Sequence, residues 1–139
     1  MKKRIKLFIK SEQKYSDHSN SELIEYNTEG ILYKKREKYY LLYKNKDLLN
    51  ANSRIKIEPL NKKVSIYRDK PKLNQLFIKN QEFSSDYPTA CGVFDMKIYT
   101  MALDINCQQN RGKLGICYKL YLNKEYTSKN HLEISWEIL

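Results

Sequence analysis

Apolar and polar residues alternate along most of this chain with a period of two, in short runs that polar turn residues separate. Successive side chains of a β-strand point to opposite faces, so this alternation predicts strands with one buried face. The clearest run begins at Gly92, after which Phe94, Met96, Ile98 and Thr100 alternate with more polar residues. No segment of ten or more residues shows the 3.6-residue apolar period of an amphipathic helix.

The pattern predicts about nine strands, joined mostly by short connections. They are expected at residues 4–10, 22–35, 39–44, 54–58, 64–66, 73–79, 92–105, 114–122 and 132–138. Polar turns are expected at residues 16–21, 35–38, 61–63, 69–71 and 110–113, and a longer polar loop at 45–53. Residues 81–91 are the least periodic stretch, and they contain a proline that disfavours a helix.

Two long strands are expected to carry a β-bulge, because their apolar residues change parity. In the first, Gly30 interrupts the run, and a bulge there would bring Tyr33 to the same inner face as Tyr26. In the second, the apolar positions from Leu103 onward take the opposite parity, which predicts a bulge near residues 100–102.

These strands predict an all-β protein: a single antiparallel up-and-down β-barrel of about 8–10 strands that spans residues 1–139 as one domain. Long strands with tight successive turns favour such a barrel over a sandwich. Closure would also remove the edge strands at which exposed Ile and Tyr residues promote aggregation.

The net charge of +10 is concentrated in one half of the chain. Residues 1–72 hold 19 basic and 9 acidic residues, whereas residues 73–139 are balanced. If consecutive strands are neighbours, this half forms one basic side, which suggests a surface for nucleic acid or another polyanion. The candidate residues for this alternative are Lys34, Lys35, Arg36, Arg54, Lys56, Lys62 and Lys63.

Composition offers a competing explanation of the charge. Of the 26 basic residues 21 are Lys, and Lys, Asn, Ile and Tyr, whose codons are AT-rich, make up about two-fifths of the chain. A genome with AT bias produces this profile without selection for a basic surface. A surface selected for phosphate usually favours Arg, whose planar guanidinium grips phosphate with two hydrogen bonds. Nucleic acid is therefore not the favoured partner.

The sequence excludes several kinds of chemistry. Three cysteines and two histidines, without a C-x-x-C motif, make a dedicated zinc site improbable. Neither a glycine-rich phosphate loop nor a G-x-S-x-G elbow is present. No nucleophile, base and orienting group can be assembled, so we expect no catalytic residue, no enzyme activity, no cofactor and no metal.

The expected compartment is the cytoplasm. Residues 1–10 lack the uninterrupted apolar segment of a secretory signal, and no window approaches the roughly 18 apolar residues of a transmembrane helix. Cys107 and Cys117 flank an expected turn, where they could face each other across a hairpin, but reduced thiols are expected in a reducing compartment.

The 12 tyrosines bear on the barrel interior. Barrels of about eight strands have interiors that side chains just fill, or that hold one small ligand, and buried tyrosines can serve either purpose. The candidate ligand-binding residues, all expected in the interior, are Tyr26, Tyr33, Tyr43, Thr100, Tyr118 and Trp136.

Four segments of the chain share their order and spacing with a known family: residues 28–30 with Tyr33 and 39–43, residues 92–96 with 98–100, residues 112–120, and residues 130–134. In these segments the chain resembles the YwiB-like family of uncharacterised bacterial proteins, whereas residues 44–80 match less well. The resemblance implies a calycin or lipocalin-like β-barrel. It implies no activity, and it brings no catalytic or ligand-binding residues.

The leading hypothesis is a non-enzymatic β-barrel that binds a small molecule of unknown class in its interior. Polyanion binding through residues 1–72 is the first alternative. A partner-binding adaptor barrel with a packed interior is the second. The oligomeric state is left open.

Overall fold

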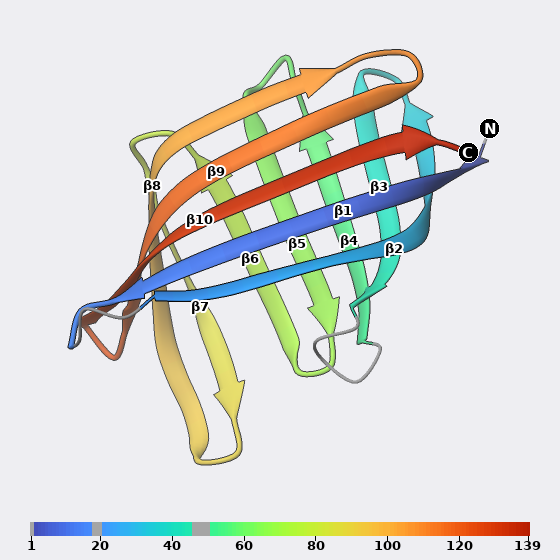
Figure 1. The fold of residues 1–139 in the computed structure, drawn as a ribbon. Helices are drawn as coiled ribbons and strands as arrows, with labels where there is room; N and C mark the ends of the chain where they lie inside the picture. The colour runs from blue at the N-terminus through green and yellow to red at the C-terminus, as the bar shows by residue number, and fades with distance from the viewer. Residues whose placement is uncertain (1, 18–20, 46–50) are drawn as a thin grey trace.

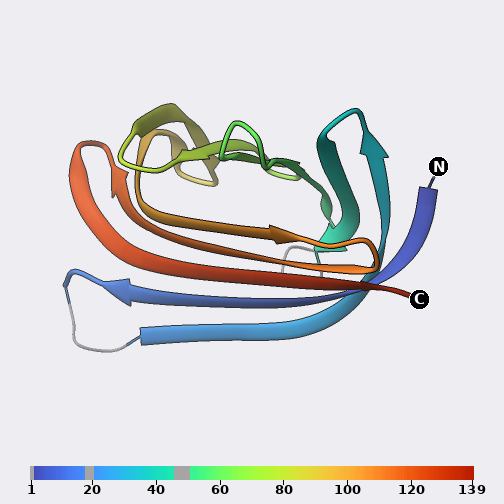
Figure 2. The same cartoon turned by 90° about the horizontal axis from the view of Figure 1, so that it is seen from above.

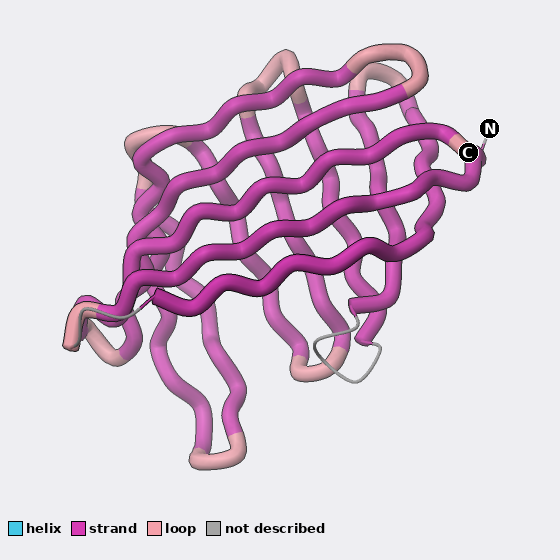
Figure 3. The backbone as a smooth tube through the Cα atoms, viewed as in Figure 1, coloured by secondary structure: helices cyan, strands magenta, loops and turns pink. Residues whose placement is uncertain are grey.

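The computed structural model describes residues 2–17, 21–45 and 51–139, and within these ranges it contains ten strands and no helix (Figures 1 and 3). The strands are β1 (Lys2–Tyr15), β2 (Ser21–Lys35), β3 (Lys38–Asn45), β4 (Ala51–Glu58), β5 (Lys63–Asp69), β6 (Lys72–Ile78), β7 (Glu82–Thr89), β8 (Gly92–Cys107), β9 (Arg111–Leu122) and β10 (Glu125–Ile138). The all-β prediction is confirmed. The expected turn at 16–21 and loop at 45–53 fall largely on residues 18–20 and 46–50, outside the described ranges.

The strands form one antiparallel sheet in the order β6-β5-β4-β3-β2-β1-β10-β9-β8-β7. Apart from the β1–β10 pair, which joins the two ends of the chain, every pair of neighbours is consecutive in sequence, so the connectivity is up-and-down as predicted. From above, β8, β9, β10, β1 and β2 form one wall opposite the remaining strands (Figure 2). The result is a nearly closed barrel.

The sheet is interrupted between β6 and β7, and two features bridge this gap. The Asn80 N–H donates to the Thr100 carbonyl (2.7 Å), and the Thr100 N–H donates to the Gln81 carbonyl (3.2 Å), which fastens the β6–β7 turn to β8. Inside, the ring of Phe77 on β6 packs against that of Tyr118 on β9, with centroids 5.0 Å apart. Backbone and side chains together complete the wall.

Strand β7 covers most of the stretch for which the sequence predicted no regular element. Its inward side chains include Phe83 and Tyr87, and among the described strands it pairs with β8 alone. Pro88 is compatible with this place, because an edge strand can lack one ladder donor. A strand also replaces part of an expected turn, because β9 begins at Arg111, within the turn expected at 110–113.

Of the two expected bulges, one is confirmed and one is wrong. The β8–β9 register shifts between Thr100 and Ala102. At Gly30, however, the pairing of β2 with both neighbours is continuous. Leu32 is therefore the inward residue, 8% exposed, whereas Ile31 is 37% exposed.

The glycine at position 30 has a different role. A Cβ there would collide with the Leu42 carbonyl oxygen and with the Leu7 side chain. Gly30 pairs with Ile5 of β1 and with Tyr43 of β3. Glycine therefore permits close approach of the neighbouring strands rather than a change of register.

The hydrophobic core occupies one end of the barrel. Each side chain that is fully buried there contributes roughly 1.5–3 kcal/mol relative to an exposed one. The fully buried core residues are Ile5, Leu7, Leu41, Ile55, Ile57, Val64, Phe77, Ile98, Leu114 and Ile116. Toward the other end, the inward positions become more polar, and a candidate site lies there.

Candidate ligand site in the barrel interior

The inward positions change from apolar to polar toward the barrel end at which β1 leads into β2. On β1 they read Ile5, Leu7 and Ile9, and then Ser11 and Gln13. The same change occurs on β5, where Arg68 follows Val64 and Ile66, and on β10, where Asn130 lies beyond Ile134 and Leu132. Polar side chains are thereby carried into the barrel.

This end of the interior contains a cavity of about 310 Å³. All ten strands contribute to its lining, so its shape depends on closure of the whole barrel. Part of the cavity volume exists because some of the inward residues are small. One of them is Ser53, which is 4% exposed.

Arg68 is a charged residue in the cavity wall. It continues the inward parity of Val64 and Ile66 on β5, and its Nε donates to the Pro71 carbonyl at 3.4 Å. Burial lowers its pKa below the ordinary value of a guanidinium, against the opposing influence of tyrosine hydroxyls, first that of Tyr87. A guanidinium nevertheless stays protonated at neutral pH, so the cavity carries a positive charge.

In the lining, Tyr118 lies beside both Arg68 and Asn130. Burial raises the pKa of the Tyr118 hydroxyl to about 12, although the amides of Gln75 and Asn130 beside it act in the opposite direction. The Oδ1 of Asn130 accepts a hydrogen bond from Ser128 Oγ at 3.1 Å. Its Nδ2, in a residue only 2% exposed, has no hydrogen-bond partner in the described part of the chain.

The structure brings three of the six predicted ligand residues to this cavity. They are Tyr26, Tyr43 and Tyr118, and the Tyr26 hydroxyl donates to Asn45 Oδ1 at 2.9 Å. Thr100 and Trp136 are buried as expected, but neither is in the lining.

The interior position predicted for Tyr33 is wrong. Because β2 has no bulge at Gly30, Tyr33 is on the face opposite to Leu32. Its ring stacks on Tyr40 of β3, with centroids 4.6 Å apart and an interplanar angle of 5°. Tyr33 therefore belongs to the outer surface.

Sequence reasoning missed Arg68, Gln75 and Asn130. A signal was available, because each has the same parity as buried apolar residues on its own strand. Because charged and amide side chains are usually solvent-exposed, however, these three residues were not expected inside the barrel.

Two of the predicted polyanion-binding cations, Lys56 and Lys63, share an acidic partner within the protein. The Glu58 side chain is 5% exposed and lies 3.5–4.0 Å from the amino groups of Lys38, Lys56 and Lys63. Burial alone would raise the pKa of Glu58, but a hydrogen bond from Asn61 and the three ammonium charges outweigh it, and the pKa lies below 4.5. The basic surface is thus partly neutralised.

The other predicted cations are exposed. The Arg54 guanidinium lies over the ring of Tyr67, 5.4 Å from its centroid, and the Lys34 amino group lies 5.3 Å from that of Tyr39. Lys34, Lys35 and Arg36 are exposed around the β2–β3 turn, and Lys62 is exposed in the β4–β5 turn.

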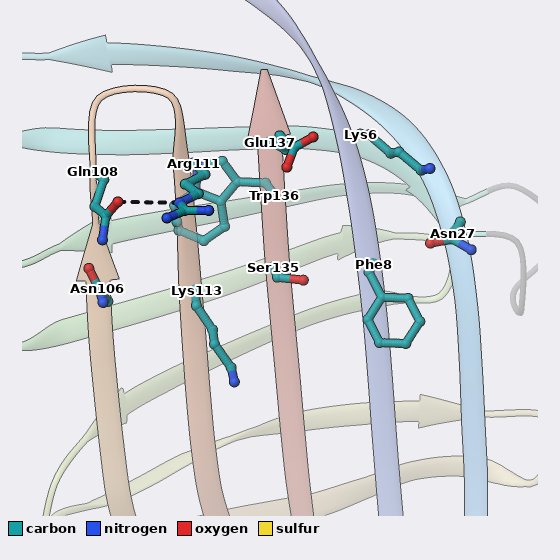
Figure 4. Close-up of a pocket in the computed structure, with 11 residues that line it drawn as sticks. Lys6, Phe8, Asn27, Asn106, Gln108, Arg111, Lys113, Ser135, Trp136 and Glu137 are labelled. Atoms are coloured by element: carbon teal, nitrogen blue, oxygen red, sulfur yellow. Dashed lines mark hydrogen bonds between the residues drawn. The ribbon is translucent and has the colours of Figure 1, made fainter. Parts of the chain in front are cut away.

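A second hollow, of about 520 Å³, lies on the outer surface over β8, β9, β10, β1 and β2 (Figure 4). It combines the cations Lys6, Arg111 and Lys113 with Phe8 and Glu137. None of these side chains is buried, so the hollow lacks the desolvated polar groups found in the interior cavity.

The cysteines do not form the arrangement considered from the sequence. Cys107 pairs with Gly112 across the β8–β9 ladder and Cys117 pairs with Ala102, so the two do not face each other. Burial raises the pKa of the Cys107 thiol to about 11. Across the described ranges, no three His, Cys, Asp or Glu side chains gather as metal ligands. No helix in these ranges is long and apolar enough to cross a membrane.

Fold and cavity together define the class: an antiparallel β-barrel of ten described strands, with a polar cavity at one end. The chain belongs to the family described as "Domain of unknown function (DUF1934)", whose model matches residues 9–134. This confirms the family resemblance seen in the sequence.

A curated relative and a solved structure agree with this assignment. The chain is 24% identical over 139 residues to "Uncharacterized beta-barrel protein YwiB" of Bacillus subtilis (strain 168), covering 99% of this chain and 96% of that protein. The crystal structure of the ywiB protein from Bacillus subtilis matches with a TM-score of 0.85 at 25% identity, covering 99% of this chain and 93% of that one. Neither description names an activity or a ligand.

Proposed function

We propose that this protein is a non-enzymatic, single-domain cytoplasmic barrel that binds a small molecule in its interior cavity. The observation that carries the proposal is the cavity of about 310 Å³ lined by Tyr26, Tyr43, Tyr118 and Arg68. Small-molecule sites are typically concave, mostly apolar, and supplied with a few convergent polar groups, and their volumes begin near 300 Å³.

The residues of the interior support a ligand-binding barrel better than a barrel whose interior is only packed. A barrel used only as a scaffold gains stability when apolar side chains fill it. Here Ser11 and Ser53 occupy inward positions, and the buried Asn130 amide has a donor without a partner among the described residues. A partner-binding adaptor with a packed interior is correspondingly less well supported.

Native mass spectrometry of the protein as purified, without refolding, tests the proposal. We expect a reproducible mass increment that disappears on denaturation. The Ser53→Met variant extends a side chain into the cavity and should lose the increment, whereas Ser65→Met, on the outer face of β5, should keep it. Binding of N-phenyl-1-naphthylamine, a neutral fluorescent dye, provides a second readout with the same variants.

Three results are decisive. The interior site is supported if Ser53→Met loses the mass increment and dye binding while Ser65→Met keeps both. Retention of both in a folded Ser53→Met variant contradicts it. Absence of any increment together with no dye binding to the parent protein also contradicts it.

Polyanion binding is the second candidate, and the exposed Lys34, Lys35 and Arg36 favour it. Its affinity for single-stranded RNA would fall steeply with salt, because bound counterions are released. Replacing the three residues with Gln should weaken binding to all sequences equally. No binding at low salt would end this alternative.

A further inference from the structure

We propose that the ligand of the interior cavity is a small monocarboxylate with an apolar body, held with its carboxylate at Arg68 and Asn130. The inference rests on the proposed function, interior binding of a small molecule, and it adds the chemistry of the ligand.

The first argument is charge. The cavity lining includes Arg68 but no Asp or Glu among the described residues. Within the same residues, no carboxylate lies within 4.0 Å of the guanidinium, although Glu58 attracts three lysines elsewhere. A partly buried cation without a counter-ion is costly, and a bound anion removes that cost.

The second argument is hydrogen bonding. Asn130 Nδ2 is a buried donor that finds no partner in the described structure, and Arg68 presents further N–H groups beside the hydroxyls of Tyr87 and Tyr118. An ionised carboxylate only accepts hydrogen bonds, so it complements a wall of donors. A ligand with an ammonium group would instead oppose both the charge and the donors.

The third argument is the rest of the lining. Ile9, Ile66, Leu73, Leu120 and Leu132 supply apolar surface around the same cavity. A ligand that is polar throughout would leave these side chains poorly matched. A phosphate monoester dianion would bring a second negative charge that one guanidinium cannot compensate, which favours a monoanion.

Octanoate is the test ligand, with 1-octanol and octylammonium as probes of equal chain length. At the roughly 30 Å³ that a water molecule occupies in the liquid, the cavity has room for about ten such small units, which suits an eight-carbon acid. Calorimetric titration at neutral pH should show that octanoate binds more tightly than 1-octanol, and that octylammonium binds least.

Two variants and a control separate charge from packing. Arg68→Gln should weaken octanoate about tenfold or more, the usual effect of removing a charge-assisted hydrogen bond, and leave 1-octanol unchanged or tighter. Asn130→Asp, nearly equal in size, should also weaken octanoate, because it adds a negative charge to the cavity. Arg54→Gln removes an equal charge from the outer face and should change neither ligand.

The outcomes distinguish this inference from the proposed function. Equal affinity for octanoate and 1-octanol, unchanged by Arg68→Gln, overturns the carboxylate assignment but leaves interior binding in place. If mass spectrometry identifies a neutral or cationic molecule in the purified protein, the carboxylate assignment is likewise overturned and interior binding remains. Failure of all three probes and of N-phenyl-1-naphthylamine, together with the absence of any mass increment in the purified protein, overturns both.

Discussion

The indole ring of Trp136 lies directly over Gly112, its ladder partner on the neighbouring strand, in the space that a side chain at position 112 would occupy. Trp136 is 3% exposed, and it is the single tryptophan of the chain. The glycine therefore makes room for the largest side chain of the core, at the barrel end away from the cavity.

Gly112→Ala should destabilise the protein. Its Cβ would overlap the six-membered ring of Trp136, and overpacking of this kind typically costs about 1–3 kcal/mol. Urea unfolding followed by tryptophan fluorescence measures the loss, and the emission of the native state should shift as the indole is displaced.

Gly115→Ala on the same strand is the matched control. The nearest atom that its Cβ would meet is Asp104 Cβ at 3.9 Å, an ordinary contact. Its free energy of unfolding should stay within about 1 kcal/mol of the parent, because alanine fits there and restricts the unfolded chain. Equal effects of the two substitutions would show that Trp136 does not depend on Gly112.

Glu58 should make stability depend on acid pH. Its folded-state pKa is lowered, so the stability that it contributes is present above the unfolded-state value near 4.5 and is lost as the pH falls through the folded-state value. Glu58→Gln should cost about 1–3 kcal/mol at neutral pH, since three ammonium groups lose their shared counter-ion.

The acid dependence of the Glu58→Gln variant should be correspondingly smaller. Urea unfolding at neutral and at acid pH measures both effects. Glu29→Gln removes an exposed carboxylate paired with Arg4 and should cost no more than about 1 kcal/mol at neutral pH. An equal loss in both variants would contradict a special role for the buried carboxylate.

The bulge in β8 was predictable and the straight course of β2 was not, for a physical reason. In β8, the apolar residues themselves change parity around Met101, so the sequence of this one strand predicts the bulge. In β2, Ile31 and Leu32 are both apolar, and either can face inward. The contacts that decide between them come from Leu7 and the Leu42 carbonyl on neighbouring strands.

The site shows the same division. That Tyr26, Tyr43 and Tyr118 point inward follows from alternation alone. That they share one cavity with Arg68 depends on the register of ten strands, which no single segment encodes. The local pattern therefore predicts on which face of the sheet a residue lies better than it predicts which residues of other strands lie next to it.

Thr100→Val should leave stability unchanged or raise it. The Thr100 side chain is fully buried, and its Oγ1 has no hydrogen-bond partner in the described part of the chain. Valine has nearly the same shape and removes a buried, unsatisfied hydroxyl, whose cost is about 1–3 kcal/mol. The variant should also bind octanoate like the parent, because Thr100 is not in the cavity lining. A clear loss of stability would reveal a partner for the hydroxyl.

Tyr118 should make stability fall at alkaline pH. Its folded-state pKa of about 12 lies above the ordinary value of 10. The stability that it contributes is therefore complete below pH 10 and is lost as the pH rises toward 12, because the unfolded chain releases its proton first. Over this interval the loss is on the order of 2 kcal/mol.

The slope of the free energy of unfolding against pH isolates this contribution. Tyr118→Phe should reduce the alkaline slope, while Tyr40→Phe, on the outer face against Tyr33, should keep it. The Cys107 thiol, with its pKa of about 11, adds a loss of the same sign at lower pH. All three proteins retain that thiol, so its contribution cancels in the comparison. An unchanged slope in Tyr118→Phe would mean that the hydroxyl ionises in the folded barrel as readily as in the unfolded chain.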